Sequence, residues 1–229
     1  MTADGVIASD DPGAFIAKWR GAWPEWQFVE DFVPAPERAL ADAWRALQFE
    51  LQEAAWGGAD ARPGEAKLGW WVEEFAGWAQ GRRRHPLGVR LQRHAAPWTH
   101  LATALPTLAA SRTRPNDAAH AWEQVAPAAD AVATVESALL GGRADPSAAA
   151  AAWLHARLAR HPGHAVPLDH DAPASWARAL QRAWPDTRGL AASRRIELAL
   201  ARARLARHDA SAPRGPVAAL WAGWRAARG

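Results

Sequence analysis

The sequence predicts an all-α protein, and three observations lead to that expectation. Alanine, leucine and arginine, which all favour helices, are abundant, while the β-branched residues that favour strands are scarce. Leu68, Trp71, Phe75 and Trp78 recur at i, i+3, i+7 and i+10, which places them on one side of a helix. Pro63-Gly64 and Gly81 bound this stripe as start and stop signals. At 229 residues the chain suits one domain with a sizeable core.

Four helices are expected in the first part of the chain. Residues 1–10 are interpreted as a flexible tail, and residues 11–229 as a single helical domain. Asp11-Pro12 is a suitable cap for a short helix, and Pro24, Pro36 and Gly57-Gly58 separate the next segments. The expected helices carry Phe15 to Trp19 and span residues 24–33, 37–55 and 65–80.

The helix expected at residues 37–55 is apolar on two faces. Leu40, Trp44, Leu47 and Leu51 form one stripe, and Phe49 and Trp56 lie on the far side. A helix with two apolar faces is usually central to a bundle. Its short Gly-rich connection to the helix at residues 65–80 predicts that the two pack side by side. This packing should bury Leu47, Leu51, Trp71 and Phe75.

Seven further helices are expected in the second part of the chain. Asn116 and Ser147 are interpreted as N-caps, Pro106 as a kink or stop, and Pro127 as a bend. Residues 161–173 and 209–216 are expected to be loops. The expected helices span residues 89–94, 97–105, 116–140, 147–160, 174–183, 189–207 and 217–227.

Two short strings carry a family resemblance. Residues 67–75 read KLGWWVEEF, and residues 81–87 read GRRRHPL. Together they resemble the squalene/phytoene synthase family, in which a helix with a Trp-Trp-x-Glu-Glu-like sequence leads into a basic turn ending in His-Pro. The resemblance extends more weakly from about residue 15 to residue 224. It implies an all-α bundle of the isoprenoid-synthase type, in a family that condenses prenyl diphosphates head to head.

The resemblance also implies two aspartate-rich helical motifs that hold magnesium diphosphates. The first should fall at residues 48–55, which read QFELQEAA, where Glu50 and Glu53 are the only acids. At i, i+3 they are close enough to share a ligand, but they straddle two faces of the helix. A residual metal site and ordinary salt-bridged glutamates both remain open for this pair.

The second motif should fall at residues 147–160, which read SAAAAAWLHARLAR. No Asp or Glu occurs between Asp145 and Asp169, and the chain has no tyrosine to match the family's functional tyrosines. Carboxylate ligands are therefore missing from this segment. The sequence predicts that prenyl transfer has been lost, with no catalytic residue, no resident metal and no cofactor.

A binding or assembly role is the leading hypothesis. Phe49-Glu50-Leu51 is similar to a Val-Glu-Leu-like segment in the complex I assembly factor branch of the superfamily, which also lacks the aspartates. Glu50, Glu53, Trp71 and Glu74 are the candidate pocket residues, for an apolar prenyl-like ligand or a protein partner. One alternative is an active prenyltransferase that binds magnesium through Glu50 and Glu53. Another is a helical module that binds protein or nucleic acid.

Charge is unevenly distributed along the chain. Residues 1–80 hold 14 acids and 6 bases, and residues 81–229 hold 10 acids and 21 bases. The basic part suits an anionic membrane surface or phosphate groups, or is simply a solvated surface. The arginines of residues 194–207 fall around several sides of one helix, so nucleic acid is not expected. Without cysteine, a charged-then-apolar leader or a long apolar run, a cytoplasmic protein is expected, with peripheral membrane contact left open.

Overall fold

A computed structural model describes residues 11–229, and the expected tail at residues 1–10 lies outside the described residues. Within residues 11–229 every regular element is helical, which confirms the all-α prediction. The elements up to the middle of the chain are α1 (Gly13–Ala22), α2 (Trp26–Val29), a 3-10 turn η1 (Glu30–Phe32), α3 (Ala35–Trp56), α4 (Arg62–Ala79), α5 (Gly88–Leu91) and α6 (Trp98–Ala110). The remaining ones are α7 (Ala118–Leu140), α8 (Pro146–Arg160), α9 (Pro162–Ala165), α10 (Pro173–Arg182), α11 (Ala192–Leu205) and α12 (Pro216–Ala227).

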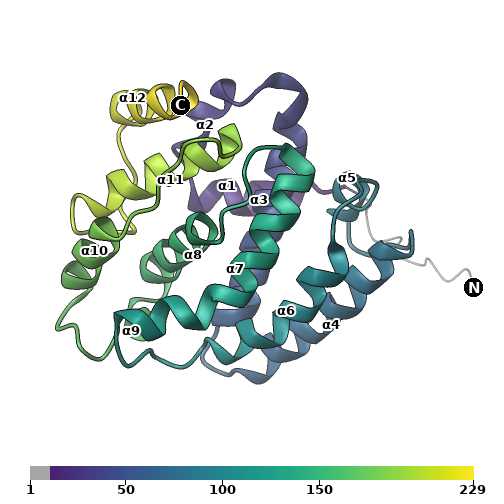
Figure 1. The fold of residues 1–229 in the computed structure, drawn as a ribbon, viewed down its shortest axis with the longest axis horizontal. Coiled ribbons are helices and arrows are strands. Elements are labelled where there is room, and N and C mark those ends of the chain that lie inside the picture. Colours follow the sequence, from purple (N-terminus) through teal and green to yellow (C-terminus); the bar gives the residue numbers. More distant parts are fainter. Residues whose placement is uncertain (1–10) are drawn as a thin grey trace, which may run out of the picture.

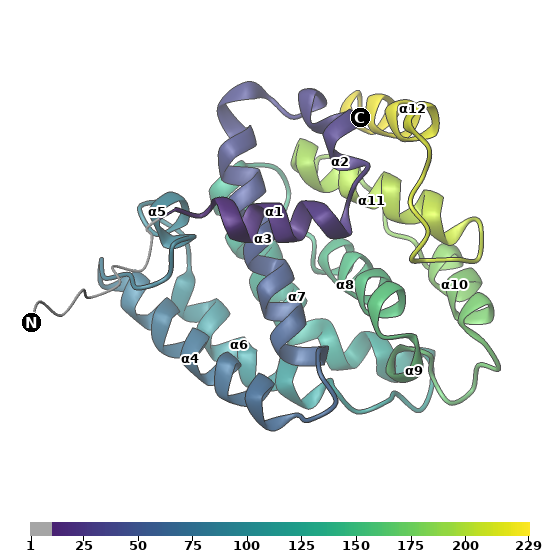
Figure 2. The ribbon, with the colours of Figure 1, turned by 180° about the vertical axis from the view of Figure 1, so that it is seen from behind.

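The long helix α3 lies in the middle of the bundle. It packs against α1, α4, α5, α7 and α8, as its two apolar faces predicted. Around it the other helices follow in the order α4, α6, α7, α8, α11 and α12, each packed against the next (Figure 1). Seen from behind, α1 crosses over α3 (Figure 2).

The expected packing of α3 on α4 is confirmed. Leu47 and Leu51 of α3 and Trp71 and Phe75 of α4 are each fully buried, with 0% of their surface exposed. A loop at residues 57–61 connects the two helices. The Phe75 ring also stacks on Trp98 of α6 at a centroid distance of 6.1 Å, so α4 joins α3 to α6.

Two expected helix caps were wrong by one or two residues. Asp117 rather than Asn116 caps α7, because its Oδ1 accepts the backbone N–H of His120 at 2.8 Å. Asp145 rather than Ser147 caps α8, where its Oδ1 accepts the N–H of Ala148 at 3.0 Å. In both cases the carboxylate accepts a free N–H group of the first turn, and its negative charge complements the positive end of the helix dipole.

Pro106 lies inside α6 and Pro127 inside α7, and both helices continue past the proline, which fits the expected kink at Pro106 and bend at Pro127. One other detail differs from the sequence expectations. The loop expected at residues 161–173 contains the short helix α9. None of the helices formed by residues 11–229 is long and apolar enough to cross a membrane.

Candidate functional site

The segments of α3 and α8 singled out by the family resemblance lie against each other. Trp153 Nε1 of α8 donates to Gln48 Oε1 of α3 at 3.1 Å. One turn further along α3, Gln52 Oε1 accepts a hydrogen bond from Arg160 Nη2 of α8 at 2.6 Å. Gln48 and Gln52 are four residues apart and therefore share one face of α3. This interface is thus made by amides, an indole and a guanidinium, in the place where the resemblance implies facing carboxylates.

Side chains fill the space between these two helices. Residues 148–158 of α8 are buried throughout, and the Trp153 ring meets Trp56 of α3 edge-on at 6.1 Å. Arg157 is 1% exposed and donates to Gln124 Oε1 at 3.1 Å and to the carbonyl oxygen of His164 at 2.9 Å. Burial lowers the pKa of Arg157 to about 10, so the group still carries a positive charge at neutral pH. This charge lies beside the position where a second metal motif would stand.

Glu50 is held by both lysines of the chain. Its Oε1 accepts from Lys18 Nζ of α1 at 2.7 Å, and its Oε2 accepts from Lys67 Nζ of α4 at 2.6 Å. Only 3% of the Glu50 side chain is exposed. Burial raises the pKa of Glu50, but the two lysine hydrogen bonds outweigh it and leave this pKa below its usual value. Glu50 is therefore an ionised carboxylate with a cation on each oxygen.

Glu53 belongs to a different group of charges. Its Oε1 lies 3.1 Å from Arg160 Nη1 and 3.8 Å from His161 Nε2, both at the end of α8. The nearby His161 ring and the charge of Arg160 lower the pKa of Glu53. The Phe49 ring lies between the two groups, with Lys18 and Arg160 at 5.4 and 4.5 Å from its centroid. Glu50 and Glu53 are thus not brought together around one ligand position.

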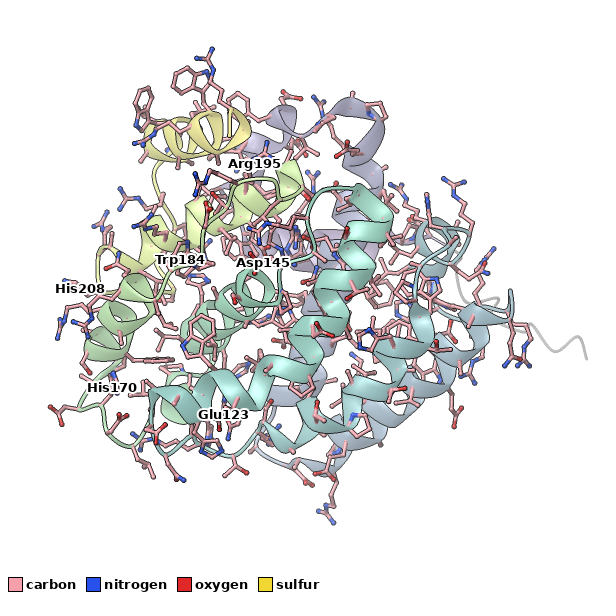
Figure 3. The ribbon with its side chains drawn as sticks, viewed as in Figure 1. Glu123, Asp145, His170, Trp184, Arg195 and His208 are labelled. Atoms are coloured by element: carbon pink, nitrogen blue, oxygen red, sulfur yellow. The ribbon has the colours of Figure 1, made fainter. Side chains whose placement is uncertain are left out.

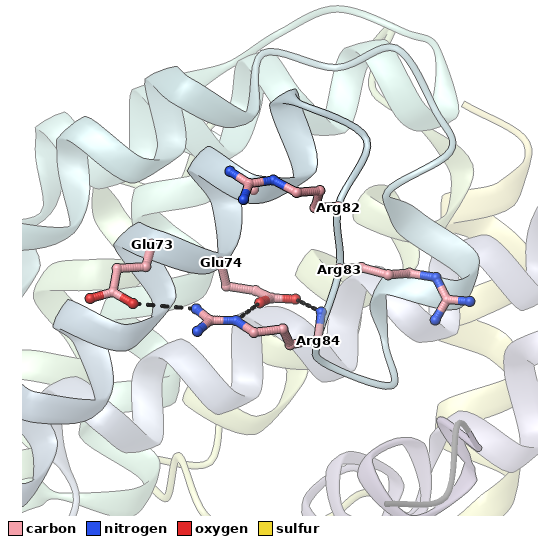
Figure 4. A pocket seen from close by; sticks show the side chains of 6 residues that line it. Glu73, Glu74, Arg82, Arg83 and Arg84 are labelled. Carbon is pink, nitrogen blue, oxygen red and sulfur yellow. Dashed lines mark hydrogen bonds and ion pairs between the residues drawn. The ribbon is translucent and has the colours of Figure 1, made fainter.

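Glu74 organises the basic turn that follows α4. Its Oε1 accepts the backbone N–H groups of Arg84 and His85 at 2.7 and 2.8 Å, and also Trp78 Nε1 at 2.8 Å. Its Oε2 accepts from Arg84 Nε at 3.0 Å (Figure 4). The spacing between Glu74 and the GRRRHPL turn therefore has a structural role, because the Glu74 carboxylate holds this turn against α4. Glu74 lines a surface cleft of about 290 Å³ together with Glu73, Gly77, Arg82, Arg83 and Arg84.

Trp71 is connected to this turn through His85. The two rings are 4.5 Å apart between centroids, and Trp71 itself has no exposed surface. Burial lowers the pKa of His85 to about 4, despite the nearby charges of Glu50 and Glu74. His85 is therefore neutral at pH 7. Of the four predicted pocket residues, Trp71 and Glu74 contact His85 and the charge of Glu50 acts on its pKa, whereas Glu53 lies against the end of α8.

A buried ionic cluster, which the sequence did not reveal, connects α3, α7 and α11. The Glu136 cluster consists of Arg45, Glu136, Arg194 and Glu197. Arg194 Nη2 lies 2.6 Å and Arg45 Nη1 3.0 Å from Glu136 Oε2, and both arginines also contact Glu197. Burial raises the pKa of Glu136, but the two arginines outweigh it and bring this pKa to about 2. Two positive and two negative groups thus balance inside the bundle.

The largest of the three described clefts is a groove between α10, α11 and α12. Its volume is about 770 Å³. Three tryptophans and four arginines are among the lining residues, and Trp184 and Arg195 are labelled in Figure 3. These seven residues are Trp184, Arg195, Arg202, Trp221, Trp224, Arg225 and Arg228. The spacing of Trp221, Trp224, Arg225 and Arg228 is the sequence signal that could have indicated this surface.

Comparison of the chain with protein-family models, with curated proteins and with solved structures finds no match. Within residues 11–229, no three His, Asp or Glu side chains are arranged to hold a metal ion. The donor set at the α3–α8 interface is also unsuited to magnesium. Magnesium prefers carboxylate and water oxygens, and two cationic side chains, Arg157 and Arg160, lie in this region.

Proposed function

We propose that this chain is a squalene/phytoene synthase-like helical protein of the isoprenoid-synthase type that acts as a binding or assembly factor and does not transfer prenyl groups. The observation that carries this proposal is the composition of the α3–α8 interface. Gln48 and Gln52 face α8, and the partners they meet there are Trp153 and Arg160. Amides at i, i+4 have the geometry of a carboxylate pair without its negative charge.

The chemistry of prenyl transfer explains why this composition matters. Ionising an allylic diphosphate requires that the negative charge of the leaving group be neutralised as it develops, which metal ions held by carboxylates can do. Glu50 is an ionised carboxylate on α3, and its two oxygens are already bonded to Lys18 and Lys67. A metal ion would have to displace both ammonium groups. Glu53 is engaged by Arg160 on another face.

The packing of the α3–α8 interface and the positions of the arginines indicate which kind of partner the chain would bind. The α3–α8 interface is filled by Trp56, Trp153 and Arg157, which disfavours a prenyl chain between these helices. Many arginines of the basic part of the chain point inward as well. Arg194 pairs with Glu136, and Arg204 pairs with Glu25. This distribution leaves no continuous basic stripe along α11 and favours a protein or lipid partner over nucleic acid.

A turnover assay tests the proposal. Purified protein is incubated with farnesyl or geranylgeranyl diphosphate and magnesium, and released diphosphate is measured. No enzymatic release above the buffer control is expected. A double variant, Glu50→Gln with Glu53→Gln, is compared with a matched double variant, Glu65→Gln with Glu73→Gln, which changes two exposed glutamates of α4. Turnover that disappears only in the first variant would support the active-transferase alternative instead.

A further inference from the structure

We propose that the outward face of α12 docks on an anionic lipid bilayer. The surface consists of Val217, Leu220, Trp221, Trp224, Arg225 and Arg228, here called the α12 stripe. These residues follow each other at i, i+3, i+4, i+7, i+8 and i+11, so they lie on one side of the helix. The stripe is apolar toward its N-terminal end and basic toward its C-terminal end. This inference does not depend on whether the protein has lost prenyl transfer.

Large apolar side chains are exposed on this stripe. Val217 is 81%, Leu220 41% and Trp221 59% exposed. The described part of the chain has one other large apolar side chain that is comparably exposed, Leu168 at 60%. Single exposed apolar residues are ordinary, but a contiguous group on one helix is typical of an interaction surface. The Trp221 and Trp224 rings stack at 5.1 Å, which makes one broad aromatic surface.

The inward face of α12 is built from small residues. Ala219 and Gly223 are buried, and a Cβ atom at Gly223 would lie 2.6 Å from Val29 Cγ1 of α2. Glycine therefore lets the helix backbone approach α2 closely. Arg195 of α11 fixes the other end of the helix, because its Nε and Nη2 donate to the carbonyl oxygens of Ala226 and Ala227 at 2.7 and 2.9 Å. The helix is thus anchored at the edge of the molecule (Figure 1).

This orientation is the reverse of an ordinary amphipathic helix. In a helix that serves only the fold, the large apolar side chains turn inward and contribute buried area. Here alanine and glycine turn inward, and valine, leucine and tryptophan turn outward. The exposed group therefore contributes little to folding. Its arrangement is explained by a partner outside the chain.

Charge and residue type select a bilayer as that partner. Residues 216–227 contain no acidic side chain. Arg225 and Arg202 have no carboxylate partner among the described residues, and Arg228 lies over the Trp224 ring at 4.2 Å. In the adjacent groove Asp186 is the one acidic side chain of the lining, and it pairs with Arg188. Tryptophan favours the headgroup depth of a bilayer, and exposed arginine attracts anionic lipid phosphates.

Vesicle binding by the full chain tests the proposal. The protein is mixed with vesicles of phosphatidylcholine alone or of phosphatidylcholine with phosphatidylglycerol, and the bound fraction is measured by flotation at low and at high salt. Binding to the anionic vesicles at low salt is expected, with a decrease as salt rises. Neutral vesicles should bind much less.

Two variants separate the apolar and the basic parts of the stripe. Arg225→Gln with Arg228→Gln should weaken binding to anionic vesicles by about thirtyfold, since each surface arginine contributes about fivefold. Leu220→Ser with Trp221→Ser should weaken it by about tenfold or more, through lost apolar insertion. Both pairs are at the surface, so the circular dichroism spectrum and melting temperature should match those of the parent protein.

Matched controls test whether the position of these residues matters. Arg82→Gln with Arg93→Gln removes the same charge near α4 and α5, across the molecule from α12, and Leu168→Ser removes an equally exposed apolar side chain. Both controls should bind nearly as well as the parent. Equal losses in control and stripe variants, or no binding at low salt, would overturn the proposal. A dimer that dissociates in the Leu220→Ser, Trp221→Ser variant, without vesicle binding, would assign the stripe to a second copy and also overturn it.

Discussion

Replacing Glu136 by glutamine should destabilise the protein by an amount that can be worked out from the Glu136 cluster. The carboxylate accepts from Trp44 Nε1 at 2.7 Å and from Arg194 Nε and Nη2 at 2.9 and 2.6 Å. Arg45 is a fourth contact at 3.0 Å. The variant Glu136→Gln keeps the shape of the side chain but leaves two buried arginines with a single carboxylate partner, Glu197.

Two routes give a similar magnitude. Lowering the pKa of Glu136 from 4.5 to about 2 corresponds to about 3 kcal/mol of stabilisation at neutral pH. Breaking a buried ion pair by removing one partner costs about 3–5 kcal/mol in general. The agreement gives an expected loss of about 3 kcal/mol in the free energy of unfolding.

The effect should also depend on pH in a defined direction. The pKa of Glu136 is lower in the folded than in the unfolded protein, so the unfolded protein takes up the proton first on acidification. The stabilisation is therefore complete above pH 4.5 and is lost as the pH falls toward 2. The difference between parent and Glu136→Gln should shrink over the same range.

Urea denaturation followed by circular dichroism measures these free energies at neutral and acidic pH. Asp130→Asn is a matched control on the same helix. The Asp130 side chain is 53% exposed, and this substitution should change stability by no more than roughly 0.5 kcal/mol. A loss below about 1 kcal/mol in Glu136→Gln, or a loss that is the same at every pH, would refute the reasoning.

Two further predictions concern buried rings. Trp71→Ala should lower the free energy of unfolding by about 3–5 kcal/mol because Trp71 is fully buried, whereas Trp221→Ala, at a 59% exposed site, should leave it nearly unchanged. Equal melting temperatures for these two variants would contradict the assigned packing. Burial and the charge of Arg204 lower the pKa of His155 to about 3, so stability is lost as the pH falls below 6.5. On acidification from pH 7 to 5, His155→Phe should therefore lose about 2 kcal/mol less than the parent protein, which urea denaturation can measure.

Much of the fold was predictable because helices are specified locally. Apolar spacing and proline positions predicted α3, α4 and α8 closely, and the two apolar faces of α3 predicted its central place. The errors at Asn116 and Ser147 arose because two acceptors stand near each helix start, and spacing alone does not show which one turns toward the free N–H groups.

The candidate site was less predictable because its partners come from distant parts of the chain. Glu50 meets lysines 32 and 17 residues away, and Arg194 meets Glu136 58 residues away. Helical periodicity shows which side chains share a face but not which helix covers that face. For the same reason Gln48 and Gln52 were not recognised as the pair that faces α8.

The orientation of α12 was not predicted from the sequence, although the spacing of its tryptophans and arginines carries a signal for it. An apolar stripe is ordinarily assigned to the core, and the stripe of Val217, Leu220 and Trp221 has that spacing. The close approach of Gly223 to Val29 and the exposure of Val217 and Trp221 show that the small side of the helix faces inward.

Metal binding at α3 is the most direct test of the proposed function. The proposal requires that Glu50 and Glu53 pair with lysine and arginine side chains and do not hold a magnesium ion. Mn²⁺, which accepts the same oxygen ligands as Mg²⁺, is titrated into the protein, and the free ion is followed by electron paramagnetic resonance. Because Glu50 is bonded to Lys18 and Lys67, and Glu53 to Arg160, we expect no saturable site. A stoichiometric Mn²⁺ site that disappears in the Glu50→Gln, Glu53→Gln variant would contradict this expectation.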